Sequence, residues 1–343
     1  LELSSVDQGG TPFEGLLVSP NQKLIAVHSW PGRLEVRDVA SLEVIAYEKI
    51  GIDFGLRMAF SADSELVATT GAGKTEVRLW NTNEATLRST EDVIAVSTIE
   101  RPHPIRALAF STTEPRLAIA EKEGQITFWN PKTGNAIEGS LDCPLPINAM
   151  AFSPDGSQLA AIHSSSQQDS SILVYDLAER QLSKTLQGRQ RYITCIAWSR
   201  SASRNVLATG SPEGVCLWNG ETFDDLNTMA TIGPVSALTF TPDGSRLAAD
   251  MRNRHAVQIW ETDTSDVVTI IRGHDRPVVG SGFVNQGAEY VSCGTEGVLS
   301  KWDLDQANSF ETLASADEAG DEQRARWLFG RDEPVRRSDV VLL

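Results

Sequence analysis

The sequence predicts an all-β fold, a β-propeller of seven four-stranded antiparallel blades, and three observations lead to this prediction. One pattern of apolar runs and tight turns recurs every 42 to 50 residues. Two separate landmarks within that pattern advance in step, and each occurs seven times. The apolar runs are short and rich in β-forming residues, and the segments between them carry turn residues.

The two landmarks define the copies. The first is a residue, usually aromatic, at the end of an apolar run, and it falls at Val18, Phe60, Phe110, Phe152, Trp198, Phe240 and Phe283. The second is a residue, again usually aromatic, followed by a polar or acidic one, and it falls at Arg37, Trp80, Trp129, Tyr175, Trp218, Trp260 and Trp302. Because both landmarks keep nearly the same spacing, the chain contains seven copies of one unit.

Each copy predicts a small antiparallel sheet. In the clearest copies, which begin at Ala149 and Ala237, a Ser-Pro-Asp-Gly or Thr-Pro-Asp-Gly turn separates two apolar runs. Proline fixes φ early in such a turn, and glycine supplies the positive φ that closes it. A single sheet of about four strands exposes both of its faces, whereas radial stacking of the copies buries them.

The repeat length and the pairs Gly273-His274 and Trp302-Asp303 resemble the WD40-repeat family in a divergent, bacterial-like form. The resemblance covers about residues 15–313. It implies a buried, hydrogen-bonded structural tetrad in the last copy, made of His274, Ser292, Glu296 and Trp302, with glutamate in the place of the usual aspartate. The other copies lack most of this set, so we expect the ring to depend more on apolar packing than on polar networks.

We expect one propeller over residues 1–314 and a tail over residues 315–343. Two segments compete to complete the last blade, residues 1–6 and residues 309–314, and we favour the N-terminal strand. The tail starts with a capping-box pattern at Ser315 and is expected either to form a short helix as far as Phe329 or to be partly disordered. Because the sequence begins at Leu1 and not at Met, we also expect an upstream segment to be missing.

Composition limits the classes of partner. The formal net charge of -16 argues against nucleic acid and against an anionic membrane. We find no run of about 18 apolar residues and no signal-peptide pattern in the first ten residues. The four cysteines form no CxxC pair, so we interpret them as core thiols in a reducing compartment and expect a cytoplasmic protein.

Motifs that carry catalysis are missing from the sequence. It contains no GxxxxGKS/T phosphate loop, no GxGxxG after a strand, no HExxH and no GxSxG. The innermost strands read as small and apolar residues rather than as the His, Asp and Glu of enzymatic propellers. We therefore expect no catalytic residue, no metal site and no cofactor. The alternative is a propeller enzyme, hydrolase or lactonase-like, with a metal in the central channel.

The family resemblance implies that a partner binds on the narrower face, on the loops before each first strand and between the second and third strands. In copies five to seven these loops carry basic and aromatic residues, namely Arg189, Arg191, Tyr192, Arg252, Arg254, His255 and Arg276. Arginine makes paired hydrogen bonds with carboxylates and phosphates, and tyrosine adds an apolar anchor. We expect a patch for an acidic or phosphorylated segment; the alternative is a rim of solvated arginines paired with nearby acids.

The predicted function is a non-catalytic platform that binds a protein or peptide. It would act as a scaffold or as a sensor in signalling, either alone or as one domain of a larger protein or complex. A purely structural subunit of a large assembly is a third interpretation.

Overall fold

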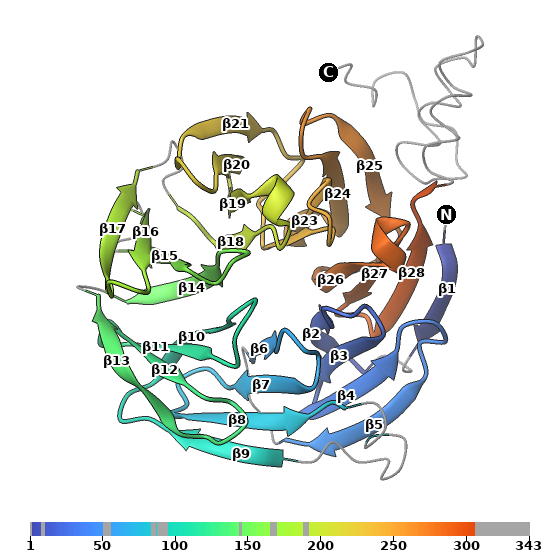
Figure 1. Cartoon of the computed structure of the whole chain (residues 1–343). Helices are drawn as coiled ribbons and strands as arrows, with labels where there is room; N and C mark the ends of the chain where they lie inside the picture. The colour runs from blue at the N-terminus through green and yellow to red at the C-terminus, as the bar shows by residue number, and fades with distance from the viewer. Residues whose placement is uncertain are drawn as a thin grey trace.

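The computed structural model describes residues 2–7, 11–50, 56–83, 87, 95–143, 146–164, 170–187 and 192–305. These residues form seven four-stranded antiparallel sheets that stand around a common axis (Figure 1). The prediction of an all-β, seven-bladed propeller is therefore confirmed. Within the described residues, short 3-10 helices occupy three loops, at Ala202–Arg204, Arg252–Arg254 and Asn285–Gly287.

Each blade runs from an innermost strand at the axis to an outermost strand at the rim. Blade 1 contains β2 (Phe13–Val18), β3 (Leu24–Ser29), β4 (Arg33–Asp38) and β5 (Val44–Lys49). Blade 2 contains β6 (Arg57–Phe60), β7 (Leu66–Thr70), β8 (Glu76–Asn81) and β9 (Ala95–Glu100). Blade 3 contains β10 (Ile105–Phe110), β11 (Leu117–Glu121), β12 (Gln125–Trp129) and β13 (Ala136–Asp142). Blade 4 contains β14 (Ile147–Phe152), β15 (Gln158–Ser164), β16 (Ser170–Asp176) and β17 (Gln181–Leu186). Blade 5 contains β18 (Cys195–Trp198), β19 (Val206–Ser211), β20 (Gly214–Asn219) and β21 (Asp225–Met229). Blade 6 contains β22 (Ala237–Phe240), β23 (Arg246–Met251), β24 (Ala256–Glu261) and β25 (Val267–Arg272). Blade 7 contains β26 (Val278–Val284), β27 (Glu289–Gly294), β28 (Val298–Asp303) and β1 (Glu2–Asp7).

The turn after an innermost strand is held by its own side chains. Ser153 Oγ donates to Asp155 Oδ1 at 2.6 Å, and the N–H of Ser157 donates to the same oxygen at 3.1 Å. Gly156 in this turn has a φ of 72°, a conformation that glycine adopts without strain. The matching Gly244 in blade 6 has the same φ. The Ser-Pro-Asp-Gly pattern thus forms the tight turn that its residues predict.

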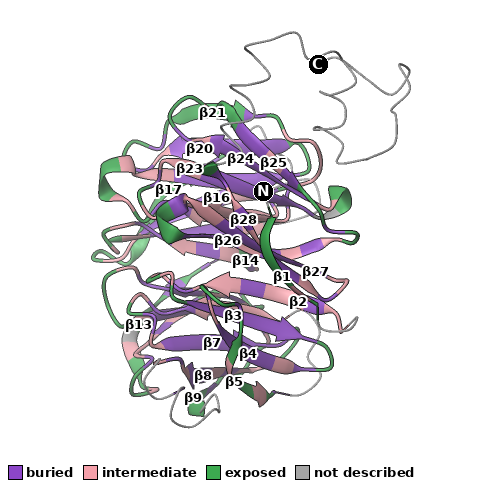
Figure 2. Ribbon diagram, turned by 90° about the vertical axis from the view of Figure 1, so that its right-hand side faces the viewer, coloured by how far each residue is buried: buried purple, intermediate pink, exposed green. Residues whose placement is uncertain are grey.

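The core lies between the blades. The second strands β3, β7 and β11 are buried along their whole length, because a blade covers them on each side. The outermost strands β5, β17 and β21 are largely exposed, and Figure 2 shows this change from buried to exposed strands. Burying one large apolar side chain contributes about 1.5–3 kcal/mol, so the stacking of blades supplies most of the stability.

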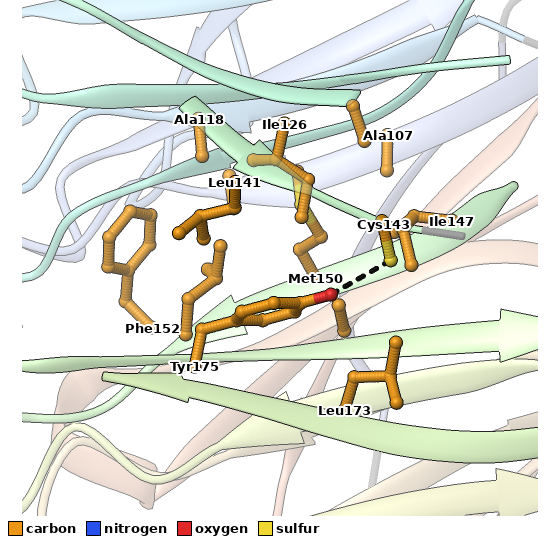
Figure 3. Packing of buried hydrophobic residues seen from close by; sticks show 14 of the residues in the cluster. Ala107, Ala118, Ile126, Leu141, Cys143, Ile147, Met150, Phe152, Leu173 and Tyr175 are labelled. Atoms are coloured by element: carbon orange, nitrogen blue, oxygen red, sulfur yellow. Dashed lines mark hydrogen bonds between the residues drawn. The ribbon is translucent and has the colours of Figure 1, made fainter. Parts of the chain in front are cut away.

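The interface of blades 3 and 4 shows how one blade packs on the next (Figure 3). Ile126 and Leu141 of blade 3 pack against Phe152 and Tyr175 of blade 4. Tyr175 takes the position that tryptophan holds in most copies, and only 2% of its surface is exposed. Its hydroxyl donates a hydrogen bond of 2.9 Å to Cys143 Sγ, so the buried polar atom has a partner.

The N-terminal strand closes the ring. β1 pairs antiparallel with β28, and Val6 lies opposite Leu299. Val6 packs against the apolar cluster between blades 7 and 1, and Ser300 Oγ donates to Glu2 Oε1 at 3.1 Å. The competing segment, residues 309–314, lies outside the described residues, as does the tail 315–343.

The seam between blades 7 and 1 requires two glycines in β26. A Cβ atom at Gly280 would lie 2.3 Å from the backbone nitrogen of Leu16 in β2. A Cβ atom at Gly282 would lie 2.6 Å from Cγ2 of Val18. The glycines therefore allow β26 and β2, which are distant in sequence, to approach more closely than side chains would permit.

The antiparallel strands place the loops on two faces. The loops that precede each innermost strand and those that join second to third strands form one face, here called the upper face. The turns that join first to second and third to fourth strands form the opposite face, here called the lower face. The upper face is the one on which the sequence predicts a partner.

Gly280→Ala is expected to lower the free energy of unfolding by about 1–3 kcal/mol, because the new methyl group meets the backbone of Leu16. Gly15→Ala is the matched control, since its Cβ would meet only the flexible end of Met58, at 3.2 Å. Urea unfolding of both variants measures the difference. Equal stability of the two variants would contradict the close approach at the seam.

Candidate functional site

The predicted patch lies on the upper face over blades 5 to 7. Tyr192, just before β18, exposes 43% of its surface. Arg254, in the loop between β23 and β24, is exposed, and so is Arg276, in the loop before β26. His255 has a φ of 51° and a partly buried side chain. These four residues thus present one aromatic side chain and two guanidinium groups to solvent.

Three members of the predicted set are not located. Arg189 and Arg191 lie outside the described residues, and so does the side chain of Arg252. Their place in the patch remains a prediction from the sequence.

The side chain of Arg254 is held in place by the loop before β22. Its Nε donates to the carbonyl oxygen of Ile232 at 2.9 Å. Its Cγ packs over Gly233, where a Cβ atom would lie 2.7 Å away. Within the described part of the chain its two Nη atoms make no hydrogen bond or ion pair. The guanidinium is therefore oriented by the protein while its outer edge is available to a ligand.

Arg272, the last residue of β25, joins the patch although the sequence did not single it out. Its side chain is exposed at one end, but burial of the rest lowers the pKa of Arg272, and the nearby charge of Arg254 lowers it further. Arginine stays protonated despite such shifts. Its position directly before Gly273-His274 was the signal in the sequence that could have identified it.

Two more arginines lie in the upper halves of neighbouring innermost strands. Arg57 begins β6 and Arg106 is the second residue of β10, and both are partly buried. Burial lowers the pKa of Arg57, and the charge of Arg106 adds to the shift. The expectation that innermost strands contain only small and apolar residues is therefore wrong near the upper face. It came from the strand ends next to the aromatic anchors, which are indeed apolar.

Seven other arginines of the described chain have acidic partners. The pairs are Arg33 and Arg37 with Glu35, Arg78 with Glu76, Arg101 with Glu121, Arg116 with Glu114, Arg204 with Asp263 and Arg246 with Glu261. Among the described residues no acid pairs with Arg57, Arg106, Arg254, Arg272 or Arg276. In a protein with a net charge of -16, these five arginines thus have no acid within ion-pairing distance among the described residues.

The four residues of the predicted tetrad form one hydrogen-bonded chain in blade 7. His274 Nδ1 contacts Glu296 Oε1, and His274 Nε2 lies 2.8 Å from Ser292 Oγ. Trp302 Nε1 donates to the same Ser292 Oγ at 2.8 Å, and its ring meets His274 edge-on at 6.2 Å. His274 and Ser292 are buried. The chain ties the loop before β26, which carries Arg276, to two strands of its own blade.

Other blades retain only parts of this arrangement. Trp80 Nε1 donates to Thr69 Oγ1 at 2.8 Å in blade 2, and Trp218 donates to Thr209 at 3.2 Å in blade 5. In blade 1 the tryptophan is replaced by Arg37, which pairs with a fully buried glutamate. The polar contacts vary from blade to blade while the apolar packing is kept, as the sequence suggests.

Asp250, at the end of β23 and just before the Arg254 loop, is a buried acid that the sequence analysis did not identify. Only 2% of its surface is exposed. Ser281 Oγ donates to Asp250 Oδ1 and lies 2.7 Å from the hydroxyl of Tyr290, while Asp250 Oδ2 is buried with no partner. Burial raises the pKa of Asp250 to about 6, and the Ser281 hydrogen bond offsets only part of that shift.

The sequence predicts no metal site, and the alternative interpretation places a metal ion in the central channel. Among the residues that the structure describes, no three His, Cys, Asp or Glu side chains are grouped so that they could hold a metal ion. The alternative of a metal-dependent propeller hydrolase therefore has no ligand set in that part of the chain. In the same residues no helix is long and apolar enough to cross a membrane.

The buried carboxyl of Asp250 predicts a pH-dependent stability. Its pKa rises from 3.8 in the unfolded chain to about 6 in the fold, so its contribution is greatest below pH 3.8 and is lost as pH rises through 6. Asp250→Asn cannot ionise, so its stability relative to wild type should rise by about 3 kcal/mol between about pH 4 and about pH 7. Urea unfolding across this range checks the prediction, and a difference that does not change with pH would contradict it.

The family described as WD domain, G-beta repeat, matches residues 136–176 and 180–219. The protein transport protein SEC31 of Chaetomium globosum is 27% identical over 247 residues, covering 67% of this chain and 19% of its own length. A putative BTB/POZ domain and WD-repeat protein of Acanthamoeba polyphaga mimivirus is 22% identical over 174 residues, covering 50% of this chain and 31% of its own. The WD repeat and SOCS box-containing protein 1 of Xenopus tropicalis is 28% identical over 111 residues, covering 32% of this chain and 25% of its own length.

The matched region spans between a fifth and a third of the length of these relatives. Their likeness to this chain therefore concerns the repeats and not the whole of each protein. The seven-bladed ring and the matched repeats agree in register, since residues 136–176 span β13 to β16 and residues 180–219 span β17 to β20. Residues 136–176 and 180–219 thus match the WD40 repeat, and the chain is similar to the WD40-repeat family.

Proposed function

We propose that the protein is a non-catalytic platform whose upper face binds an acidic or phosphorylated segment of a partner protein. The observation that carries this proposal is the set of arginines without acidic partners, above all Arg254, Arg272 and Arg276. An arginine at a surface commonly pairs with an acid of its own chain, as Arg246 does with Glu261. Charged groups left without such partners are available to an external anion.

The construction of the loops supports the same proposal. Arg254 is oriented by its bond to Ile232, and the loop with Arg276 is fixed by the His274 tetrad. A ligand that meets pre-oriented groups loses less conformational entropy on binding. Tyr192, with 43% of its surface exposed, offers an apolar contact on the same face.

The WD-repeat relatives favour a role in protein interaction for the fold as a whole. None of the four cysteines is in a disulfide, and three are buried, which fits a reducing compartment. We therefore propose an intracellular scaffold or sensor module in signalling, possessing no catalytic residue and no cofactor, with Arg189, Arg191 and Arg252 extending the basic patch.

The patch is tested with two fluorescent peptides. One is octaglutamate, and the other is an octaserine peptide in which every second serine is phosphorylated. Arg254→Glu combined with Arg276→Glu is expected to weaken binding at least tenfold, because two attractive contacts become repulsive. Fluorescence anisotropy at low and at physiological salt measures the affinity, and the wild-type affinity should fall as salt rises.

The matched control reverses two charges on the lower face, in the variant with Arg180→Glu and Arg204→Glu. It changes the net charge by the same amount, so it should bind both peptides much as the wild type does. Equal weakening by the two double variants would show that only net charge matters and would refute an upper-face patch.

A further inference from the structure

A cavity of about 470 Å³ opens at the lower end of the central channel, on the side opposite the basic patch. It lies between the lower ends of β2, β18, β22 and β26, so blades 1, 5, 6 and 7 form its walls. Its lining includes the large apolar residues Leu17, Val18, Trp198, Leu238, Phe240 and Phe283. Its size falls within the range of roughly 300–1,000 Å³ that small-molecule sites occupy.

One charged side chain lines this cavity, that of Arg200. Arg200 is two residues beyond the aromatic anchor Trp198, where three other copies carry a proline, at Pro20, Pro154 and Pro242. Of the seven copies, only blade 5 has a charged residue at this position, and it lies at the mouth of an apolar cavity. Arg200 has no ion pair or hydrogen bond with any residue that the structure describes. The side chain of Arg200 is exposed, and partial loss of hydration against the protein lowers the pKa of Arg200.

Most of the polar side chains of the lining are already engaged. Ser19 Oγ donates to Asn21 at 2.7 Å, and Thr241 Oγ1 donates to Asp243 at 2.7 Å. The side-chain oxygen of Gln22 accepts from the N–H of Gln286 at 2.6 Å.

Ser281 donates to Asp250, as described above. Among the lining side chains with polar atoms, Arg200 and Thr239 are those without such an internal bond.

We propose that this cavity binds a small amphiphilic monocarboxylate, with its hydrocarbon chain against the apolar walls and its carboxylate on Arg200. One cation and apolar walls match a ligand with one anionic head and a chain that needs no hydrogen bonds. A peptide fits less well, because each of its amides would need a partner that the engaged lining cannot offer. The site is separate from the proposed upper-face platform, so either can fail without the other.

Calorimetric titration of the full chain with octanoate, 1-octanol and octylamine tests the site. Octanoate is expected to bind at least tenfold more tightly than the other two, because only its head group carries a negative charge. Arg200→Gln should weaken octanoate binding at least tenfold. Arg204→Gln is the matched control: Arg204 lies in the same loop, pairs with Asp263 at 3.2 Å and does not line the cavity, so binding should be unchanged.

Equal binding of octanoate and 1-octanol, or undiminished binding to the Arg200→Gln variant, would overturn the proposal. Absence of octanoate binding at millimolar concentration would do so as well. Acetyl-dileucine with a free carboxylate serves as the competing ligand, and tighter binding of this peptide than of octanoate would overturn the assignment to a fatty-acid-like ligand. Should Arg200→Gln fail to fold, Arg200→Lys keeps the charge and must retain the preference for octanoate over 1-octanol.

Discussion

The whole structure depends on the face-to-face packing of each blade on the next around a closed ring. An isolated four-stranded sheet would expose two apolar faces, and only closure removes the last pair of them. Here closure has two parts, the pairing of β1 with β28 and the tight contact of β26 with β2 at Gly280. The apolar cluster that joins blades 7 and 1 contains residues from both ends of the propeller, such as Phe13 and Leu299. Every loop position on either face is set by this closure.

The repeat could be predicted from the sequence because it is written in local terms. Anchor residues such as Phe152 and Trp302 recur at a nearly fixed spacing, and the Ser-Pro-Asp-Gly turn has one favoured shape. The last tetrad could also be named, because its members keep the family's order along the chain. What could not be predicted are contacts between copies. Nothing in a local pattern reveals that Gly280 faces Leu16, or that Asp250 is buried beneath Ser281.

The same limit applies to the candidate site. Arg254 and Arg276 were identified from their loops, but Arg57 and Arg106 lie within the first two residues of strands that otherwise read as core. A pattern of apolar residues says which strand faces inward and does not say which of its ends reaches a surface. Whether an arginine has an acidic partner is also a property of the fold, since Arg101 and Glu121 meet across 20 residues of sequence. The proposed patch rests on that property. Among the described arginines without an acidic partner, Arg57, Arg106, Arg254, Arg272 and Arg276 lie on the upper face, and Arg180 and Arg200 lie on the lower face.

We propose that the upper face of the closed ring is the binding surface. Hydrogen–deuterium exchange of the full chain, with and without the octaglutamate peptide, tests it most directly. We expect slower exchange in the upper loops, residues 231–236, 252–255 and 273–277, and unchanged exchange in the lower turns, residues 199–205 and 241–245. Protection confined to the lower turns, or spread evenly over both faces, would contradict it.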